Sequence, residues 1–385
     1  MKNYVSRHIE GEIKIALSTM PVTAIIGPRQ CGKSTLSKYL LESLGETIYL
    51  DLERPSDLQK LNDAEWFLSS HKEKLICIDE IQRKPDLFPL LRSLSDEWNE
   101  PGKFLVLGSA SRDLLRQSSE SLAGRISYKR LTPFLSSEIA DNISLETYLI
   151  RGGFPKSVLA RDETTSTQWR EDFITTFLER DLLQWKGFSS GTMRRLWQML
   201  AHVNGQTVNY SLLGKSLGVS NVTIRNYIDL LEATFMLDVI LPYHSNMGKR
   251  LVKSPKVYIS DSGITSALLH LNSFSELYSH PVFGSIWEQV ILSNLKGHFP
   301  DAQIFFYRTS GGAELDFIMH YKNKLLAIEC KASQSPKPTK GFYSAIEDIQ
   351  PDHTFIASPI KEGWAMSKAI DVVAISEMVE KIRKF

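Results

Sequence analysis

The sequence has little cysteine, and its three cysteines form no pattern. Cys31, Cys77 and Cys330 are far apart, include no C-x-x-C pair and are odd in number. These features argue against a structural zinc site and a disulfide framework. The nine histidines are scattered, with no pair four residues apart. We find neither an internal repeat nor a low-complexity segment.

Long apolar runs and a strong net charge are also absent. No run approaches the roughly 18 residues of a membrane-spanning helix, and the amino terminus lacks an apolar signal core. We therefore expect a cytoplasmic protein with no membrane partner. The formal net charge of +1 excludes a strongly basic whole-chain nucleic-acid binder but allows a local basic patch. A chain of 385 residues is too long for one compact core and predicts several units.

What the sequence does contain is a P-loop. The segment from Gly27 to Ser34 fits the pattern G-x-x-x-x-G-K-[ST], between a strand-like run at 22–26 and a helix-like run at 35–41. Glycines let backbone N–H groups face phosphate oxygens, and the helix N-terminus adds partial positive charge. The motif predicts bound ATP with Mg²⁺. The predicted nucleotide-binding residues are Gly27, Pro28, Arg29, Gln30, Cys31, Gly32, Lys33, Ser34 and Thr35.

Particular side chains have expected roles at this site. We expect Lys33 to reach the β- and γ-phosphates and the Ser34 hydroxyl to bind the Mg²⁺. Further along, an apolar strand at 75–78 ends in Asp79 and Glu80. We predict that Asp79 holds the Mg²⁺ and that Glu80 polarises the attacking water. The alternative, an acidic turn in solvent, is disfavoured because a P-loop precedes the strand.

Two later residues are further candidates for the nucleotide site. Ser109 follows the apolar run 103–108, and this strand resembles the sensor strand of AAA-type ATPases, in which a small polar residue lies near the attacking water. Arg125 is a candidate to bring positive charge to a γ-phosphate, in its own subunit or a neighbour's. The neighbour's arginine would require a homo-oligomer. The alternative for Arg125 is an ordinary surface position.

Residues 1–132 alternate strand-like and helix-like segments. This alternation predicts an α/β domain with a parallel sheet covered by helices on both faces. The nucleotide then lies at the carboxyl ends of the strands. The predicted strands are 22–27, 47–52, 75–80, 103–108 and 126–131.

The middle of the chain predicts a helical lid at 133–200, with a sharp break at Arg151–Pro155, and a winged helix-turn-helix at 201–265. The winged helix has predicted helices at 210–217 and 221–232, a glycine turn between them, and two strand-like runs after them. In the DNA-binding interpretation, side chains from the second helix and a basic wing contact DNA. Those predicted contacts are Arg225, Lys249, Arg250 and Lys253. The alternative is a module that only packs domains together.

Residues 270–385 predict a separate α/β unit with a candidate metal site. Asp316 lies in one strand of a predicted hairpin, and alternation puts Glu329 and Lys331 on one face of the next. This arrangement resembles the restriction-endonuclease-like active site D…E-x-K. Glu288 matches an additional helix acid of such nucleases, including Holliday-junction resolvases. The resemblance implies that Asp316 and Glu329 hold a second Mg²⁺ or a Mn²⁺, with Lys331 helping to activate water against a phosphodiester. The alternative is a charged hairpin.

The whole layout resembles a large group of bacterial AAA-type ATPases that join a P-loop domain, a winged helix and a C-terminal restriction-endonuclease-like domain. The anchors of this resemblance are Gly27–Ser34, Ile78–Glu80, Ser121–Arg125, Gly152–Pro155 and Lys249–Asp261. The resemblance implies a magnesium-dependent ATPase that acts on DNA, with the nuclease-like domain cutting or gripping it. The alternative function is an ATP-dependent regulatory switch whose C-terminal domain binds a partner without cleavage.

Overall fold

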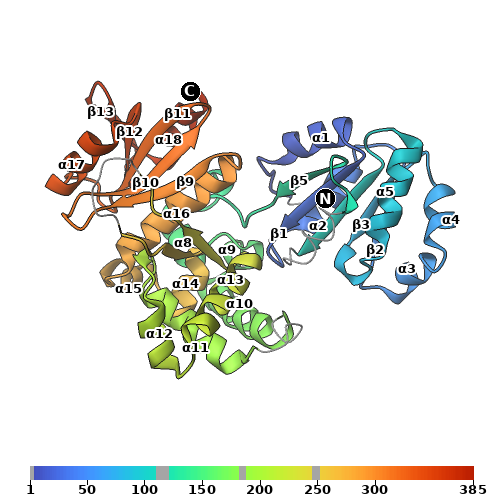
Figure 1. Cartoon of the computed structure of the whole chain (residues 1–385), viewed down its shortest axis with the longest axis horizontal. Coiled ribbons are helices and arrows are strands. Elements are labelled where there is room, and N and C mark those ends of the chain that lie inside the picture. The colour runs from blue at the N-terminus through green and yellow to red at the C-terminus, as the bar shows by residue number, and fades with distance from the viewer. Residues whose placement is uncertain (1–3, 110–120, 182–187, 245–251) are drawn as a thin grey trace. The chain divides into compact units, whose positions relative to one another are not determined.

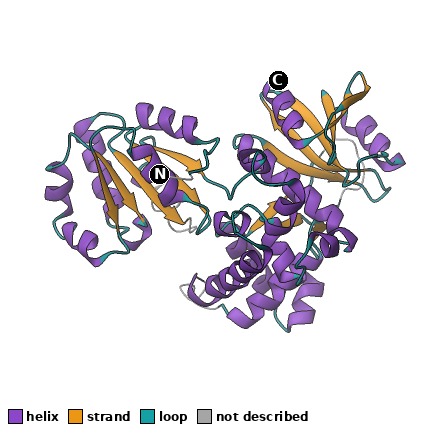
Figure 2. Ribbon diagram, turned by 180° about the vertical axis from the view of Figure 1, so that it is seen from behind, coloured by secondary structure: helices purple, strands orange, loops and turns teal. Residues whose placement is uncertain are grey.

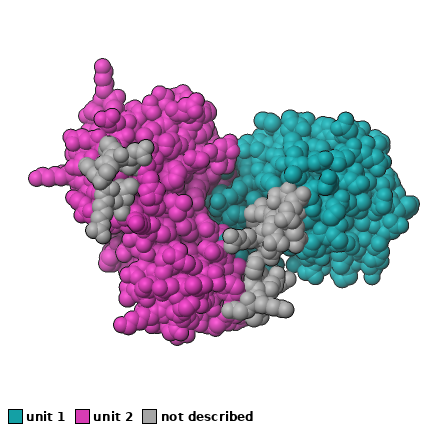
Figure 3. Space-filling model, viewed as in Figure 1, with its two compact units in different colours: residues 1–134, 233–235 teal, residues 135–232, 236–385 magenta. Residues whose placement is uncertain are grey.

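The protein is described by a computed structural model that covers residues 4–109, 121–181, 188–244 and 252–385. The chain divides into two compact units, coloured separately in Figure 3. The first unit contains residues 1–134 with 233–235, and the second contains residues 135–232 with 236–385. Each unit is described by itself. No helix in the ranges above is long and apolar enough to cross a membrane.

The first unit is built on a five-stranded parallel sheet with the order β2-β3-β4-β1-β5 (Figure 1). All five predicted strands are confirmed, with each boundary within one residue of its predicted position. The strands are β1 (Val22–Gly27), β2 (Thr47–Asp51), β3 (Leu75–Asp79), β4 (Phe104–Ser109) and β5 (Ile126–Arg130).

Alternation along the buried strands divides the core of this unit into two layers. Val22 and Ala24 of β1 point to one face of the sheet, whereas Ile25 points to the other. The first face packs against α3 (Pro55–Lys60), α4 (Ala64–Ser69) and α5 (Leu87–Trp98), and the second against α1 (Glu10–Thr19) and α2 (Lys33–Leu41). The predicted helix–sheet–helix layering is therefore confirmed (Figure 2).

The second unit begins with helices and a small antiparallel sheet. The first helices are α7 (Ser136–Ile139), α8 (Leu145–Arg151), α9 (Pro155–Val158), α10 (Glu163–Thr176), a π-helical turn (Phe177–Asp181) and α11 (Ser190–His202). The two predicted helices of the helix-turn-helix follow as α12 (Tyr210–Leu217) and α13 (Asn221–Ala233). The small sheet has the order β6-β8-β7, with strands β6 (Gln206–Thr207), β7 (Leu237–Ile240) and β8 (Lys256–Ile259).

The rest of the second unit is a six-stranded mixed sheet with helices. Its helices are α14 (Ser262–Leu268), α15 (Phe274–Ser279), α16 (Phe283–His298), α17 (Lys340–Ile349) and α18 (Ile375–Arg383). Its strands are β9 (Gln303–Arg308), β10 (Glu314–Tyr321), β11 (Lys324–Cys330), β12 (His353–Ala357), β13 (Trp364–Ser367) and β14 (Ile370–Val373). The order is β13-β14-β12-β11-β10-β9, in which β9, β10 and β11 are antiparallel and β12 is parallel to β11. The predicted subdivision of residues 133–385 stays a prediction, because these segments form one compact unit.

A buried carboxylate explains the break that the sequence predicts at Arg151–Pro155. Asp261, at the end of the β8 segment, accepts a hydrogen bond from Gly153 N at 2.7 Å and caps α14 by accepting from Ile264 N at 3.0 Å. Gly152 has a φ of +73°, and a Cβ added there would lie 2.1 Å from Asp261 Oδ1. Only glycine fits this close approach without strain.

We therefore predict that Gly152→Ala lowers the free energy of unfolding by about 2–3 kcal/mol, since it combines a strained backbone conformation with overlap on Asp261. The measurement is the urea midpoint followed by circular dichroism. Gly191→Ala is the matched control, because Gly191 lies in a helix of the same unit with open space around its Cβ position. Equal midpoints for the two variants would show that the Gly152 backbone relaxes freely.

Candidate functional site

The glycine loop of the first unit lies between β1 and α2, as the motif predicts. Gly27 ends β1, and a Cβ added there would lie 2.1 Å from the carbonyl oxygen of Leu131. Gly32 caps α2 in a left-handed conformation with a φ of +105°. Both glycines are therefore required by the backbone path. The free N–H groups of the first turn of α2 give this end of the helix partial positive charge.

Lys33 directs its ammonium group into this loop. Its side chain is 6% exposed, and Nζ donates hydrogen bonds to the carbonyl oxygens of Gly27 at 3.0 Å and Pro28 at 2.8 Å. Both hydrogen-bond partners of this ammonium in the described part of the chain are uncharged carbonyls. A phosphate group would be a stronger partner for the ammonium than these carbonyls.

Asp79 lies at the same edge of the sheet as the glycine loop, since it ends β3 and Gly27 ends the parallel strand β1. Its carboxylate is buried and has two donors. Tyr49 OH donates to Asp79 Oδ2, and the backbone N–H of Glu80 donates to Oδ1 at 2.9 Å. Burial, together with donation to Asp79, raises the pKa of Tyr49 above its ordinary value. The sequence analysis did not identify Tyr49, because its partner is distant in sequence.

Glu80 follows Asp79 in a left-handed backbone conformation with a φ of +57°. Its carboxylate accepts a hydrogen bond from the side-chain amide of Gln82. Burial raises the pKa of Glu80, although the nearby Lys33 opposes this shift. A carboxylate with a raised pKa is a better proton acceptor, which suits general-base chemistry.

The structure separates the other two candidates for the nucleotide site. The backbone of Ser109 pairs in register with Gly27, so Ser109 lies at the edge of the sheet that carries the loop, although its side chain is outside the described part of the structure. Arg125 precedes β5 and accepts from Val22 N at the opposite edge. Its guanidinium pairs with Asp96 on the surface, with Nη2 3.0 Å from Oδ2.

The prediction that Arg125 reaches the nucleotide of its own chain is therefore wrong. The length of β5 separates this arginine from the P-loop edge, because a residue that precedes a parallel strand lies at the edge where the strands begin. A contact from Arg125 to a neighbouring subunit's nucleotide stays a prediction.

Arg7 supports the glycine loop from the amino-terminal segment, and the sequence analysis missed it. The buried guanidinium donates to the carbonyl oxygens of Cys31 at 3.2 Å and Thr132 at 2.7 Å, and it lies 4.5 Å from the centre of the Phe134 ring. Arg7 thus ties the loop to the segment after β5. A single arginine before the first helix has no local pattern that predicts this role.

In the second unit, the structure brings the four candidate residues of the C-terminal site together. Phe317 pairs with Ile328 in the β10–β11 ladder, and this register places Asp316 opposite Glu329. The Cys330 N–H donates to Asp316 Oδ2 at 2.8 Å, and Lys331 Nζ donates to Glu329 Oε1 at 2.7 Å. Glu288 reaches the same site from α16, where its carboxylate interacts electrostatically with Asp316.

A lysine that the sequence analysis did not single out also occupies this site. Lys256, the first residue of β8, is 2% exposed. Its Nζ lies 3.3 Å from Glu314 Oε1, 3.6 Å from Asp316 Oδ1 and 3.9 Å from Glu288 Oε2. We refer to Glu288, Glu314, Asp316 and Glu329 as the acidic cluster.

Burial and the charge of Asp316 raise the pKa values of two members of the acidic cluster, Glu288 and Glu329. Burial and the charge of Asp316 raise the pKa of Glu288 to about 8, against the opposing effect of Lys256. Burial and Asp316 likewise raise the pKa of Glu329 to about 8, and Lys331 opposes that shift. Glu329 Oε2 is buried and accepts no hydrogen bond from any residue that the structure describes.

The predicted ligands do not fit a divalent metal in this arrangement. Within the described ranges, no group of three His, Cys, Asp or Glu side chains is placed to hold a metal ion. Asp316 has a cation at one oxygen and a backbone N–H at the other, and Glu329 Oε1 carries Lys331. Glu329 Oε2 has no hydrogen-bond donor among the described residues, and Asp316 Oδ1 has the Lys256 ammonium 3.6 Å away.

The predicted DNA contacts are described only in part. Arg225 lies on the exposed face of α13, with its guanidinium carbon 4.1 Å from the centre of the Tyr210 ring. Lys253 is exposed just before β8. Lys249 and Arg250 lie outside the described residues.

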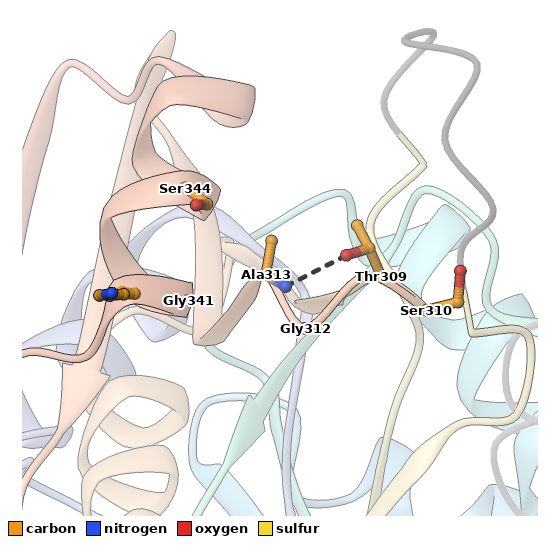
Figure 4. A pocket seen from close by; sticks show the side chains of 8 residues that line it. Thr309, Ser310, Gly312, Ala313, Gly341 and Ser344 are labelled. Carbon is orange, nitrogen blue, oxygen red and sulfur yellow. Dashed lines mark hydrogen bonds between the residues drawn. The ribbon is translucent and has the colours of Figure 1, made fainter.

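A surface hollow of about 550 Å³ in the second unit is lined by none of the predicted site residues. Figure 4 shows its walls, which are the glycine-rich loop before β10 and the first turns of α17. Ala313 N donates to Thr309 Oγ1 at 3.2 Å within that loop. A Cβ added to Gly341 would lie 2.3 Å from the carbonyl oxygen of Gly312, so the loop packs directly on the helix.

Comparison with protein families defines the class of the first unit. A family model described as an AAA domain matches residues 19–140. Two models described as domains of unknown function, DUF8612 and DUF4143, match residues 142–275 and 283–378. With its P-loop and five-stranded parallel sheet, the first unit is an AAA-type ATPase domain, a class that binds nucleotide.

The chain belongs to a family that includes the uncharacterized protein Rv2008c of Mycobacterium tuberculosis, which is 37% identical over 374 residues, or 97% of this chain and 84% of that protein. An uncharacterized protein of Methanocaldococcus jannaschii is 23% identical and matches 85% of this chain and 77% of its own length.

Two solved structures show limited similarity to the chain. One is a signal transduction ATPase with a tetratricopeptide repeat sensor from Pyrococcus horikoshii, with a TM-score of 0.31, 13% identity, and coverage of 78% of this chain and 46% of that one. The other is AMPPCP-bound DnaA from Aquifex aeolicus, with a TM-score of 0.32, 11% identity, and coverage of 60% and 90% respectively.

The raised pKa of Glu329 predicts a pH-dependent stability. Its pKa is about 8 in the folded chain against 4.5 ordinarily, so the folded state binds the proton more tightly. The resulting stabilisation is fully present below about pH 4.5 and is lost as the pH rises through 8. Glu329→Gln should therefore make the fall in stability between those values less steep, by up to about 1 kcal/mol per pH unit.

The measurement for this prediction is the urea midpoint at a series of pH values. Glu347→Gln, which changes an exposed carboxylate on α17, is the control and should leave the slope as it is in the original chain. A slope unchanged by Glu329→Gln would contradict the raised pKa, whatever the effect on absolute stability.

Proposed function

We propose that the chain is a magnesium-dependent ATPase that acts on DNA. The observation that supports the ATPase chemistry is the placement of Gly27, Lys33 and Asp79 at one edge of the parallel sheet, with the Lys33 ammonium inside the glycine loop. In this proposal the loop residues Gly27–Thr35 bind the triphosphate. Ser34 and Asp79 hold the Mg²⁺, which when bound neutralises phosphate charge.

In the proposed chemistry, the other side chains at this edge of the sheet either act on the attacking water or position the residues that bind Mg²⁺. Glu80 orients and deprotonates the attacking water, which suits its raised pKa. Ser109 lies near that water, since its backbone pairs with Gly27. Tyr49 is a positioning residue, because it donates to the Asp79 oxygen opposite the one held by Glu80 N–H.

We predict that Lys33→Ala abolishes ATP binding, because it removes the only cation that contacts the loop carbonyls of Gly27 and Pro28 in the described structure. Glu80→Gln should keep binding and lower turnover by about 100-fold, since an amide cannot accept the proton. The measurements are fluorescent-nucleotide binding and phosphate release. Equal rates of ATP hydrolysis by Glu80→Gln and the original chain would show that Glu80 does not activate the attacking water.

The DNA part of the proposal concerns the segment of α12, α13 and the small sheet, which we propose is a winged helix. Support comes from the turn between the helices, where Gly218 has a φ of +69°, and from Arg225 on the exposed face of α13. In this proposal Arg225, Lys249, Arg250 and Lys253 contact phosphates. A homo-oligomer in which Arg125 approaches a neighbour's nucleotide is part of the same proposal.

We predict that replacing Lys249, Arg250 and Lys253 together by alanine weakens DNA binding and flattens its salt dependence. Each lost phosphate contact should reduce the slope of log K against log salt by about 0.9 on duplex DNA. The measurement is fluorescence anisotropy at several salt concentrations. Lys361→Ala, an exposed lysine between β12 and β13, controls for a general change in charge. An unchanged slope in the triple variant would show that the wing does not touch DNA.

A second candidate function is a regulatory ATP switch whose C-terminal domain binds a partner without cleaving DNA. The observation that favours it is the Lys256 ammonium among the carboxylates at which the sequence predicts a metal. Two assays separate the candidates: the ATPase rate with and without DNA, and cleavage of plasmid and branched DNA with Mg²⁺ or Mn²⁺. Stimulation by DNA supports action on DNA, whereas an unaffected rate without any cleavage supports the switch.

A further inference from the structure

We propose that Lys256 is the resident cation of the acidic cluster, so that the C-terminal site holds a lysine ammonium in place of the divalent metal that its sequence pattern predicts. The inference does not depend on the ATPase chemistry or on DNA binding, since every residue in it belongs to the second unit.

The Lys256 ammonium lies between three carboxylates, where it is shared as their common cation. Lys256 Nζ lies within 4 Å of oxygens from Glu314, Asp316 and Glu288, which come from β10 and α16. A divalent ion between Asp316 and Glu288 would bring a second positive charge into the space that Nζ already occupies. Two cations in the same buried space repel, so one excludes the other unless the lysine moves away or loses its proton.

Backbone pairing on both sides fixes the position of Lys256 in β8. The strand is the middle one of its sheet, where Lys256 pairs with Thr207 on one side and Ile240 on the other. Tyr258, two residues along on the same face of β8, donates to Glu288 Oε2 at 2.8 Å. The lysine and this tyrosine therefore hold the same carboxylate of α16.

Buried polar contacts also join this strand to α16. Asn204 Oδ1 accepts from Ile259 N at 2.8 Å, and its Nδ2 donates to Gln289 Oε1 at 3.1 Å. Beside it, a Cβ added to Gly205 would lie 3.0 Å from Ser285 Cβ and 3.3 Å from Glu288 Oε2. The segment before β6, strand β8 and helix α16 are thus closely packed around Glu288.

The Lys256 ammonium stabilises the folded chain by neutralising nearby buried carboxylates, and a bound metal ion could supply the same positive charge. Removal of the Lys256 ammonium leaves Asp316 and Glu288 buried without it, which is unfavourable. Loss of the lysine also leaves Asp316 Oδ1 available as an oxygen ligand, beside Glu288 Oε2, which still accepts a hydrogen bond from Tyr258 OH. An apolar replacement of similar length should therefore convert the lysine site into a divalent-cation site.

The test is a Mn²⁺ titration of the nucleotide-free full chain followed by electron paramagnetic resonance. In the original chain we expect no Mn²⁺ site that depends on Asp316 at Mn²⁺ concentrations up to about 1 mM. In Lys256→Met we expect one such site, with a dissociation constant about tenfold or more below that concentration. The double variant Lys256→Met/Asp316→Asn should lose it. Lys361→Met, which removes an exposed lysine of the same unit, should show no Asp316-dependent Mn²⁺ site, like the original chain.

A second readout comes from stability, because a ligand that binds only the folded state raises the melting temperature. Mn²⁺ should raise the melting temperature of Lys256→Met by several degrees and leave that of the original chain unchanged. Phosphate release by Lys256→Met, measured on the same preparation, reports the ATPase separately, so failure of that activity would not be confused with failure of this proposal.

Two results would overturn the proposal. One is a Mn²⁺ site in the original chain that Asp316→Asn removes, which would show that lysine and metal coexist. The other is a folded Lys256→Met variant that gains no Mn²⁺ site. If Lys256→Met does not fold, Lys256→Gln takes its place in the titration. The comparison of the original chain with Asp316→Asn needs no lysine variant, and it decides by itself whether lysine and metal coexist.

Discussion

A charge buried in a protein must be neutralised or hydrogen-bonded, and β8 with the turn after it brings two such charges into the interior of the second unit. Lys256 lies among the carboxylates of the acidic cluster, and Asp261 accepts backbone N–H groups from Gly153 and from the start of α14. These partners come from β10, from α16, from α14 and from the segment after α8. One short strand and the turn after it therefore fix where several distant segments meet. Arg170 of α10 extends the same network, since it is fully buried and pairs with Glu163.

The first unit satisfies its buried charges at the edge of a parallel sheet. Lys33 donates to two loop carbonyls, Asp79 accepts from Tyr49, and Arg7 donates to the loop from outside the motif. Each of these charged groups therefore has a hydrogen-bond partner within the unit. Lys33, like Arg7, has uncharged carbonyls as its partners, and an anionic phosphate is a stronger partner for an ammonium group than a carbonyl is.

The parts of this structure that the sequence predicts well are those set by local patterns. Buried strands of the first unit and helices such as α12 follow from apolar periodicity, and the glycine loop follows from a motif with a defined backbone path. The edge hairpin of β13 and β14 was missed, because β13 is exposed along its whole length and therefore has no alternation. Tyr49 and Arg7 were missed because each acts on a partner far along the chain. The prediction for Arg125 within its own chain was wrong. Arg125 immediately precedes a parallel strand, and this position already places it at the edge of the sheet where the strands begin, away from the P-loop.

The acidic cluster shows the limit of a local pattern most clearly. A strand acid followed by E-x-K predicts correctly that Asp316, Glu329 and Lys331 gather at one end of a hairpin, because register and alternation decide that geometry. Whether the carboxylates are available to a metal depends instead on the total charge that surrounds them. That total includes Lys256, which lies 60 residues before Asp316 in the numbering and reaches the site only through the packing of β8 against α16. The same acids can therefore form a metal site in one chain and an internal ion-pair network in another, according to whether a third segment contributes a cation.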